Sequence, residues 1–454
     1  MIASFRALRN HGTFLNDTAP QSRPAPIIVP RSEHNISRAN ISPNALKVLY
    51  RLRSAGFGAF LVGGGVRDLL LGLHPKDFDV VTDADPDQIQ DLFRNCRLIG
   101  RRFRLAHVRF GRDIVEVATF RAAGAEPEDE RAHSDSGRIL RDNVYGTIDE
   151  DVWRRDFTVN ALYYNIADFS VWDYTQGFDD VRARVLRLIG NPETRYREDP
   201  VRMLRAMRFA AKLDFELAPE TAAPIATLGD LLRDVPPARL FDELLKLFQS
   251  GYAERSFDLL LEHDLLRYLF RDASALLLTP ERDKIIAFIR QGLANTDERV
   301  RSDKPVTPMF LYAVFLWFPI RALALKLQAE GWNDTHAMME ASSRIVAAQQ
   351  TSFPRRFSSP MKELLAMQWR FDQRHGIRAA RLLQHKRFRA AYDFMLLRAR
   401  CGEVDQETVD WWTEIQQLPP DEQQKLIGLK RRQGRRRRRG RRGAEQSEIT
   451  DAAP

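Results

Sequence analysis

The chain has 454 residues, of which 44% are hydrophobic and 29% are charged, so it is long enough to form two or more globular domains. Its two cysteines, Cys96 and Cys401, are too few for a disulfide framework, which favours a reducing compartment. Residues 1–16 contain no apolar signal-peptide core, and the most apolar segment, 309–320, is too short to cross a bilayer. We therefore expect a cytoplasmic protein without a membrane span, in which 309–320 is a buried helix.

The formal net charge of +9 is concentrated in one terminal segment. Residues 430–442 contain ten Lys or Arg and no acid, and the rest of the chain holds 60 basic and 61 acidic residues. Such a run is expected to be disordered by self-repulsion and to contact a polyanion. The preference for arginine strengthens that expectation because arginine binds phosphate with two parallel hydrogen bonds.

Strand and helix patterns alternate after a proline-containing leader. Residues 1–40 carry four prolines and little periodicity, so we expect a flexible segment. Ser42 and Pro43 then precede apolar residues at helical spacing, which predicts the start of a helix. The next predicted elements are a buried strand, a helix and a second strand, at residues 59–62, 66–71 and 78–81.

The rest of the chain divides into a mixed part and a helical part. Beyond residue 199 helical periodicity continues almost throughout, and we expect no strand there. The remaining elements predicted before that point are a helix at 86–93, strands at 108–110, 114–120, 157–166 and 185–189, and a mobile loop at 121–151. The sequence thus predicts an α+β fold, in which a head with a small mixed β-sheet and helices is followed by an all-α body and a basic tail. The expected parts are a leader, a head, a neck, a body and a tail, at residues 1–40, 41–190, 191–300, 301–428 and 429–454.

Glycines and carboxylates gather around the first predicted strand–helix–strand unit. Gly63 and Gly64 let a ligand approach the backbone, and the helix that follows, with Arg67 in its first turn, favours an anion. Asp77 and Asp79 are two apart on a strand, so their side chains leave the same face. Either feature alone is common in α/β proteins. Together they suit a divalent metal bound to a nucleoside triphosphate.

This stretch resembles motif A of the nucleotidyltransferases related to DNA polymerase β, in the branch of bacterial poly(A) polymerases and CCA-adding tRNA nucleotidyltransferases. The run Arg-Arg-Asp-Phe-Thr at 154–158, which alone would indicate a surface ion pair, resembles motif B. The resemblance implies that Asp156 is the third active-site carboxylate and that Arg155 is a triphosphate ligand. Glu116, inside a predicted strand, is the alternative third acid.

A second set of candidate residues opens the helical part. On its own, Asp199 before Pro200 is a typical helix N-cap. The resemblance adds that Asp199 and Arg202 form a protein template for the incoming base, and that Arg205 and Arg208 contact the nucleotide. A carboxylate accepts from an exocyclic amine while arginine donates to the adjacent ring nitrogen, an arrangement that adenine and cytosine satisfy and guanine and uracil do not. This pair therefore cannot separate A from C.

Three segments resemble the poly(A) polymerase pattern more than the CCA-adding one, namely 98–108, 191–197 and the arginine-rich tail. The resemblance runs from about Pro30 to Trp412 and implies template-independent transfer of AMP from ATP to RNA 3′ ends. It implies a two-metal mechanism, with Mg²⁺ or Mn²⁺ held by Asp77 and Asp79. The nearest alternative is a CCA-adding enzyme, and the second is a non-catalytic RNA-binding protein on the same fold.

RNA is the expected partner of the tail at 430–442 and of a basic helical region. This region alternates arginines with aromatic residues, a pattern that suits RNA, although a solvated helix face is the ordinary explanation. Its arginines are Arg370, Arg374, Arg378, Arg381 and Arg389.

Overall fold

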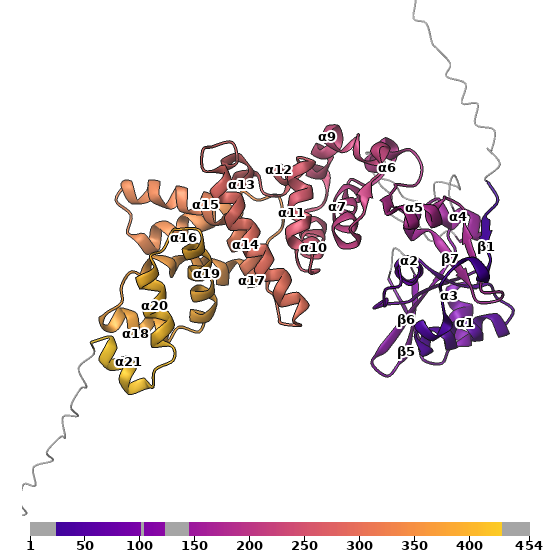
Figure 1. Ribbon diagram of the computed structural model, residues 1–454, viewed down its shortest axis with the longest axis horizontal. Helices are drawn as coiled ribbons and strands as arrows, with labels where there is room; N and C mark the ends of the chain where they lie inside the picture. The colour runs from indigo at the N-terminus through magenta and orange to yellow at the C-terminus, as the bar shows by residue number, and fades with distance from the viewer. Residues whose placement is uncertain (1–23, 101–103, 123–144, 429–454) are drawn as a thin grey trace, which may run out of the picture. The chain divides into compact units, whose positions relative to one another are not determined.

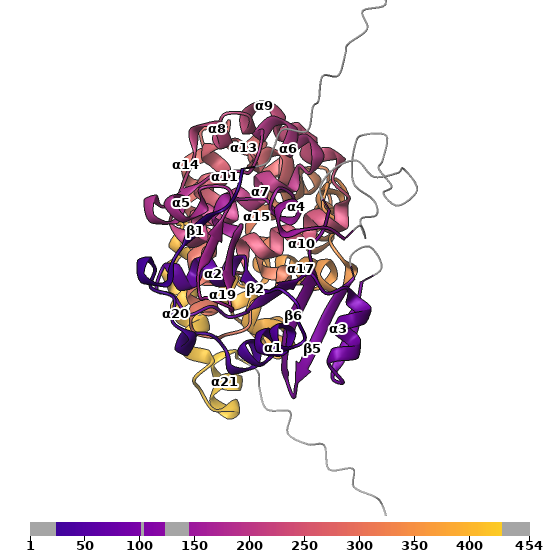
Figure 2. The ribbon, with the colours of Figure 1, turned by 90° about the vertical axis from the view of Figure 1, so that its right-hand side faces the viewer.

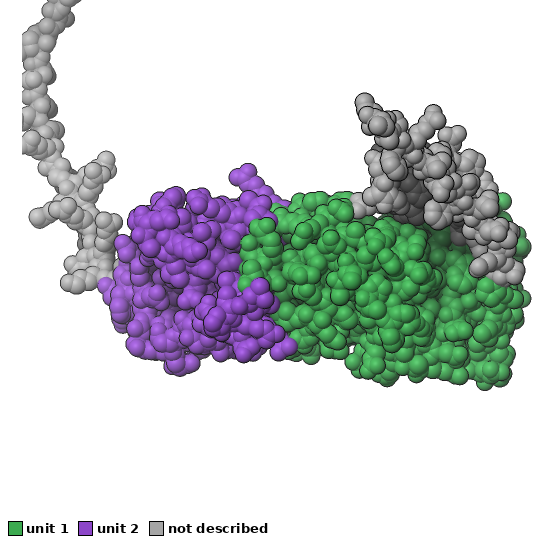
Figure 3. All heavy atoms as spheres, turned by 90° about the horizontal axis from the view of Figure 1, so that it is seen from above, with its two compact units in different colours: residues 1–275, 293–306, 349–353 green, residues 276–292, 307–348, 354–454 purple. Residues whose placement is uncertain are grey.

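The computed structural model describes residues 24–100, 104–122 and 145–428. The predicted tail, most of the predicted loop at 121–151 and the first part of the predicted leader lie outside these residues. The chain forms two compact units, shown in different colours in Figure 3. Unit 1 comprises residues 1–275, 293–306 and 349–353, and unit 2 comprises 276–292, 307–348 and 354–454. The predicted division into a head, neck and body is finer than this and stays a prediction.

Unit 1 is built on an eight-stranded mixed sheet with the strand order β1-β8-β7-β2-β3-β6-β5-β4. Neighbouring strands are antiparallel except β3 and β6, which are parallel. The strands are β1 (Ile27–Val29), β2 (Ala59–Val62), β3 (Asp79–Thr82), β4 (Cys96–Ile99), β5 (Leu105–Phe110), β6 (Asp113–Thr119), β7 (Leu162–Asn165) and β8 (Val171–Asp173). Figure 2 shows part of this sheet with helices α1 (Pro43–Ser54) and α3 (Pro86–Leu92). The mixed sheet confirms the predicted fold class.

The central strands position the candidate site. All four residues of β2 are buried, as expected for an apolar run in the middle of a sheet. In the ladder between β2 and β3, Val62 lies opposite Asp79, so the turn that follows β2 emerges beside the acidic start of β3. The parallel register pairs Val80 with Val117, which brings Glu116 near the same edge.

Helix α1 begins as the sequence predicts. The hydroxyl of Ser42 accepts from the backbone N–H of Ala45 at 3.1 Å, and Pro43 occupies the first turn, where no intrahelical donor is needed. The apolar positions Ala45, Val48, Leu49 and Leu52 are all buried. This face packs against β2, β3 and β6 and stabilises the part of the sheet that carries the acids.

Helices dominate the rest of unit 1 (Figure 1). They are α2 (Gly64–Leu70), α4 (Ile148–Val152), α5 (Gly177–Ala183), α6 (Pro192–Glu198), α7 (Val201–Leu213), α8 (Pro219–Ala222), α9 (Ile225–Leu228), α10 (Pro237–Phe248), α11 (Ala253–Glu262), α12 (Leu266–Leu269) and α13 (Arg271–Leu276). The expectation of no strand beyond residue 199 was wrong at one point, because β10 (Glu216–Leu217) pairs in parallel with β9 (Val185–Leu186). A two-residue strand is too short to produce a periodic pattern.

The leader also differs from its prediction where it is described. Residues 27–29 form β1, which pairs antiparallel with β8 at the edge of the sheet. Ile27 and Ile28 are exposed and only Val29 is buried. The prolines of this segment suit an edge strand, because such a strand needs only one row of backbone partners.

Unit 2 is helical. Its helices are α15 (Pro308–Ala329), α16 (Asp334–Ala347), α17 (Arg355–Ala366), α18 (Gly376–Leu383), α19 (Phe388–Arg400), α20 (Gln406–Ile415) and α21 (Pro420–Leu426), and α14 (Arg282–Arg301) contributes to both units. Helix α15 is longer than the predicted segment at 309–320. Within the described residues it is the one helix long and apolar enough to cross a membrane, but 72% of its most apolar stretch is buried inside the fold.

Candidate active site

A cleft of about 880 Å³ in unit 1 is bordered by eleven of the residues that the sequence singled out. They come from four places that are distant in the sequence: the turn after β2, the start of β3, the segment before β7 and the start of α7. The eleven are Gly63, Gly64, Arg67, Asp77, Asp79, Arg155, Asp156, Asp199, Arg202, Arg205 and Arg208. Glu116, the alternative third acid, is not among the residues that border the cleft.

The glycine turn allows two parts of the cleft to approach each other closely. Gly63 has a φ of +74°, and a Cβ built on it would lie 3.9 Å from both Asp79 Oδ2 and Arg155 Nη1. A Cβ on Gly65 would lie only 3.3 Å from the carbonyl oxygen of Asp77. The turn therefore places bare backbone between the Asp79 carboxylate and the Arg155 guanidinium, where the positive φ of Gly63 and the narrow space at Gly65 both favour glycine.

Asp79 lies in a locally acidic environment. Partial burial is the main reason that its pKa is raised, and the nearby charges of Glu116 and Asp77 add to the effect while Arg155 opposes it. A bound cation would stabilise the ionised form of a carboxylate whose pKa is raised in this way. Within the described ranges no three acidic, histidine or cysteine side chains form a ready ligand set. Two carboxylates that need further ligands from the substrate are the arrangement that Mg²⁺ commonly uses with phosphates.

Asp156 is largely enclosed, with 13% of its side chain exposed, and both of its oxygens are engaged. Oδ2 accepts from Nε and Nη2 of Arg205 at 2.8 and 2.5 Å, and Oδ1 accepts from the backbone N–H of Phe157 at 2.8 Å and from Asn160 Nδ2 at 3.3 Å. Burial alone would raise the pKa of Asp156, but Arg205 and the hydrogen bonds lower it overall. The carboxylate is therefore ionised and committed to Arg205.

The third acid is thus not assigned by these contacts. Asp156 would have to exchange Arg205 for a metal, whereas Glu116 is half-exposed and its Oε1 lies 3.4 Å from His107 Nε2. Both remain candidates. What the structure adds is a direct link between Asp156 and an arginine of α7 that lies 49 residues further along the chain.

Arg155 is held on one side and faces the cleft on the other. Its Nε and Nη2 donate to Asp151 Oδ2 at 3.1 and 2.8 Å, and Nε also donates to the hydroxyl of Tyr163 at 2.8 Å. Burial alone would lower its pKa, but Tyr163 and Asp151 raise it overall, so the guanidinium is permanently charged. Its Nη1 lies 3.9 Å from the position that a Cβ on Gly63 would occupy. The sequence indicated Arg155 but not the two residues that orient it.

Arg67 is more enclosed than its predicted role suggests. It is 2% exposed, donates from Nε and Nη2 to Asp68 Oδ1 at 2.9 and 2.6 Å, and donates from Nη1 to Asn160 Oδ1 at 2.5 Å. Asn160 Nδ2 also donates to Asp156 Oδ1, so the side-chain amide of Asn160 links Arg67 of α2 to Asp156. Arg67 therefore supports the wall of the cleft as well as bordering it.

The proposed base-reading pair is oriented by residues that the sequence did not single out. Asp199 Oδ2 accepts from Arg239 Nη2 of α10 at 2.7 Å, and Oδ1 accepts from the backbone N–H of Val201 at 3.3 Å. Arg202 Nη1 donates to Glu198 Oε2 at 2.8 Å. The N-cap position of α7 is occupied by Pro200, so Asp199 is one residue outside the position that the sequence predicted, but its side chain still accepts from an N–H of the first turn while it borders the cleft.

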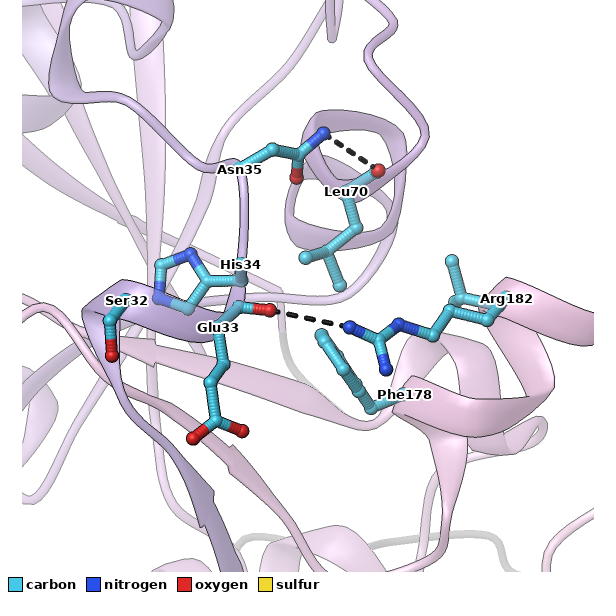
Figure 4. A pocket seen from close by; sticks show the side chains of 8 residues that line it. Ser32, Glu33, His34, Asn35, Leu70, Phe178 and Arg182 are labelled. Carbon is cyan, nitrogen blue, oxygen red and sulfur yellow. Dashed lines mark hydrogen bonds between the residues drawn. The ribbon is translucent and has the colours of Figure 1, made fainter.

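A second pocket of about 430 Å³ contains none of the predicted residues (Figure 4). Asn35 Nδ2 donates to the carbonyl of Leu70 at 3.1 Å, and Arg182 Nη2 donates to the carbonyl of Glu33 at 3.3 Å. These bonds join the segment after β1 to the last turn of α2 and to α5. We interpret this pocket as a junction between elements of the fold.

Three families match parts of the chain. The one described as "Poly A polymerase head domain" matches residues 59–187, "Probable RNA and SrmB- binding site of polymerase A" matches 214–277, and "Polymerase A arginine-rich C-terminus" matches 330–444. The last match includes most of the described part of unit 2 and continues into the basic tail.

Curated relatives cover nearly the whole chain. The chain is 49% identical over 415 residues to "Poly(A) polymerase I" of Escherichia coli O157:H7, with 89% of each chain covered. It is 44% identical to the protein of the same name from Haemophilus influenzae, with 88% of this chain and 90% of the relative covered. A "CCA-adding enzyme" of Lactobacillus helveticus is 34% identical but covers 49% of this chain and 53% of its own length.

Solved structures agree in fold. "The structure of CCA-adding enzyme apo form II" matches with a TM-score of 0.59 and 20% identity over 86% of each chain. "Thermotoga maritima CCA-adding enzyme complexed with tRNA_CCA" matches with a TM-score of 0.56 and 20% identity over 86% of this chain and 85% of that one. At this identity the likeness supports the architecture of a mixed-sheet head followed by helices.

Proposed function

Because the chain belongs to the poly(A) polymerase family, we propose that it is a template-independent polynucleotide adenylyltransferase that adds AMP from ATP to RNA 3′ ends. The observation that carries this proposal is the single cleft bordered by a glycine turn, two carboxylates and a row of arginines. In the reaction the RNA 3′ oxygen bonds to the α-phosphorus of ATP, the bond to the β-phosphate breaks, and pyrophosphate leaves. The proton of the hydroxyl passes to solvent.

Asp77 and Asp79 would hold Mg²⁺, with Mn²⁺ as a possible substitute. The fit rests on the position of both acids at the cleft. The pKa of Asp79 is raised mainly by loss of hydration and further by the charges of Glu116 and Asp77, which a bound cation would offset. A bound divalent ion would lower the pKa of the RNA 3′ hydroxyl and neutralise the triphosphate. The third acidic ligand stays open between Asp156 and Glu116.

The chain's own groups bind and orient the phosphates. The backbone at Gly63 and Gly64 lets the triphosphate approach without a side chain between them, and Arg155 presents Nη1 at the same turn. Arg205 is held in place by Asp156, and Arg208 follows it on α7. These cations would offset the charge that develops on pyrophosphate as it departs.

Asp199 and Arg202 would select the base. Asp199 can accept from the adenine N6 amine and Arg202 can donate to N1, whereas guanine and uracil present the opposite polarity at those positions. Cytosine also satisfies this pair. The near full-length match to poly(A) polymerases, against a half-length match to a CCA-adding enzyme, favours adenine addition.

RNA is the proposed partner of the basic C-terminal region. The tail at 430–442 lies outside the described residues, but the matched arginine-rich family extends into it. In unit 2, Arg374 is paired with Glu407 at 2.7 Å and Arg389 with Asp393 at 3.0 Å, so these two reach RNA only by exchanging partners. Cys96 and Cys401 are both free thiols, which fits the reducing cytoplasm that we propose as the compartment.

The test is AMP incorporation by wild type, Asp77→Ala and Asp79→Ala on unrelated RNA and on tRNA, each with ATP or CTP. We expect wild type to extend both RNAs with ATP, and both variants to lose incorporation while RNA binding stays within about twofold. Incorporation at the wild-type rate by either variant would contradict the metal assignment. CTP use that stops after a short fixed addition would identify a CCA-adding enzyme instead.

A deletion of residues 430–454 separates chemistry from RNA binding. We expect it to weaken RNA binding and flatten its salt dependence, because fewer phosphates are neutralised, and to leave turnover at saturating RNA unchanged. An unchanged salt dependence would show that RNA is not the partner of the tail.

A further inference from the structure

One face of α7 borders the cleft along most of the helix. Arg202, Arg205, Arg208 and Lys212 all line it, and their spacing of three to four residues keeps them on one side of the helix. At a rise of 1.5 Å per residue, Arg202 and Lys212 are about 15 Å apart along the axis. This face can therefore contact several groups of one extended ligand. Lys212 is the one of these four to which the proposed function assigns no contact.

The two ends of this face meet different parts of the cleft. The first end carries Arg202 beside Asp199, which we propose to read the base. Lys212 borders the cleft together with Arg67 and Asp68 of α2 and with Lys76 of the loop that leads into β3, and Arg67 lies 5.6 Å from the ring of Phe209 on the same helix. Lys212 therefore lies where α7 approaches the elements that carry the glycine turn and the acid pair.

Three of the four cations at this end form no salt bridge among the described residues. Arg67 is paired with Asp68, but over the described residues Arg208, Lys212 and Lys76 form no ion pair within 4.0 Å. The Nε of Arg208 is buried without a hydrogen-bond partner. Such a cluster is unfavourable in the free protein and is relieved by an anion.

The titration of Lys212 agrees with this crowding. Partial loss of hydration beside the cleft wall is the main reason that the pKa of Lys212 is lowered, and Arg67, Arg208 and Lys76 lower it further while Asp68 opposes them. Since Lys212 is still exposed on the cleft side, a ligand can reach its ammonium group.

On the basis of the proposed function, we infer that Lys212, with Lys76 of the same cleft, binds the terminal phosphate of ATP and then holds the pyrophosphate product. The base-reading residues at one end of α7 and this lysine at the other would span the nucleotide lengthwise. The site would distinguish a triphosphate from a diphosphate, because only the former places a phosphate at the lysine end. A phosphate of the RNA strand is the competing ligand with the same chemistry.

The test compares Lys212→Met with wild type in KM for ATP, KM for RNA and inhibition by inorganic pyrophosphate. We expect about a tenfold rise in KM for ATP and in the inhibition constant of pyrophosphate, as for the loss of one charged hydrogen bond, with KM for RNA within about twofold. Lys212→Arg should retain most of the wild-type values. Lys47→Met is the matched control, because Lys47 is exposed on α1 and does not border the cleft.

Two results would overturn the inference. One is a Lys212→Met enzyme whose KM for ATP and pyrophosphate inhibition equal those of wild type. The other is a raised KM for RNA with unchanged pyrophosphate inhibition, which would assign Lys212 to the RNA strand. If wild type incorporates no AMP, the proposed function fails. Calorimetric titration of wild type and Lys212→Met with pyrophosphate would then still decide whether Lys212 binds a polyphosphate.

Discussion

Arg239 holds the carboxylate of Asp199 in place at the start of α7. Its Nη2 donates to Asp199 Oδ2 at 2.7 Å, and the other oxygen of Asp199 accepts from the backbone N–H of Val201. The pair is only partly exposed, with 38% of the Arg239 side chain and 24% of the Asp199 side chain accessible. The acid that we propose to read the base edge is therefore oriented from both sides before any nucleotide binds.

Arg239→Gln should weaken base selection more than chemistry. Without the guanidinium, Asp199 loses one of its two orienting contacts, so we expect the preference for ATP over GTP and UTP to fall by about fivefold to tenfold. The measurement is kcat/KM for each of the four nucleotides, with Arg239→Lys as a partial replacement. An equal decrease for all four nucleotides would show that Arg239 supports the fold and not selection.

Gly63→Ala should impair the cleft through the backbone. With φ at +74° the alanine is strained, and its methyl group would lie 3.9 Å from both Asp79 Oδ2 and Arg155 Nη1. We expect a loss of about 1 kcal/mol or more in the free energy of unfolding and a clear fall in kcat/KM for ATP. Urea denaturation and steady-state kinetics measure the two effects. Gly72→Ala is the control, since Gly72 also has a positive φ of +73° but has open space around its Cβ and does not border the cleft. Equal kinetic losses in both variants would contradict the local explanation.

The ion pair between Asp156 and Arg205 makes a stability contribution that depends on pH. The folded protein lowers the pKa of the Asp156 carboxyl below its ordinary value of 3.8. The contribution of the ion pair to the free energy of unfolding is therefore fully present above pH 3.8, and it is lost as the pH falls through the lower pKa of the folded state. Asp156→Asn removes it and leaves Arg205, which is 30% exposed, without its ion-pair partner. We expect the free energy of unfolding at pH 7 to fall by about 3 kcal/mol. Urea midpoints of wild type and the variant should converge as the pH falls below 3.8, and a gap that does not depend on pH would contradict this assignment.

The residues that the sequence singled out as site candidates border one cleft, and they could be found because they lie in short local runs. Asp77 and Asp79 at strand spacing, the glycines after β2 and the run containing Asp156 are each recognisable without a tertiary structure. Their common location in one cleft follows from the mixed sheet, which pairs Val62 with Asp79. The mixed sheet also confirms the predicted α+β fold class.

The partners of these residues could not be predicted from local pattern. Arg239 reaches Asp199 across 40 residues, and Asn160 reaches Arg67 across 93, so neither pairing leaves a periodic signal. The short strands β1 and β10 were missed because two or three residues cannot display an alternating pattern. Lys212 was not singled out, because a lysine near the end of an amphipathic helix is ordinarily a solvated residue.

Unit 2 contains a carboxylate with an unusual number of donors. Glu403 is only 2% exposed in its side chain and accepts from Trp317 Nε1 at 2.8 Å, Arg321 Nη1 at 3.2 Å and Arg398 Nε at 3.3 Å. Lys284 Nζ lies 3.4 Å away. The acid therefore connects α14, α15 and α19 from the loop that follows α19.

Glu403→Gln should destabilise this unit without a direct effect on the cleft. Removing the charge leaves Arg398, which is 9% exposed, and two partly exposed cations around a neutral amide, so we expect the free energy of unfolding to fall by about 3 kcal/mol. Thermal and urea unfolding measure the change. The control is Glu340→Gln, whose partner Arg344 is 54% exposed and for which we expect a change of about 0.5 kcal/mol or less. Equal effects of the two substitutions would mean that the buried cluster contributes no more than a surface ion pair.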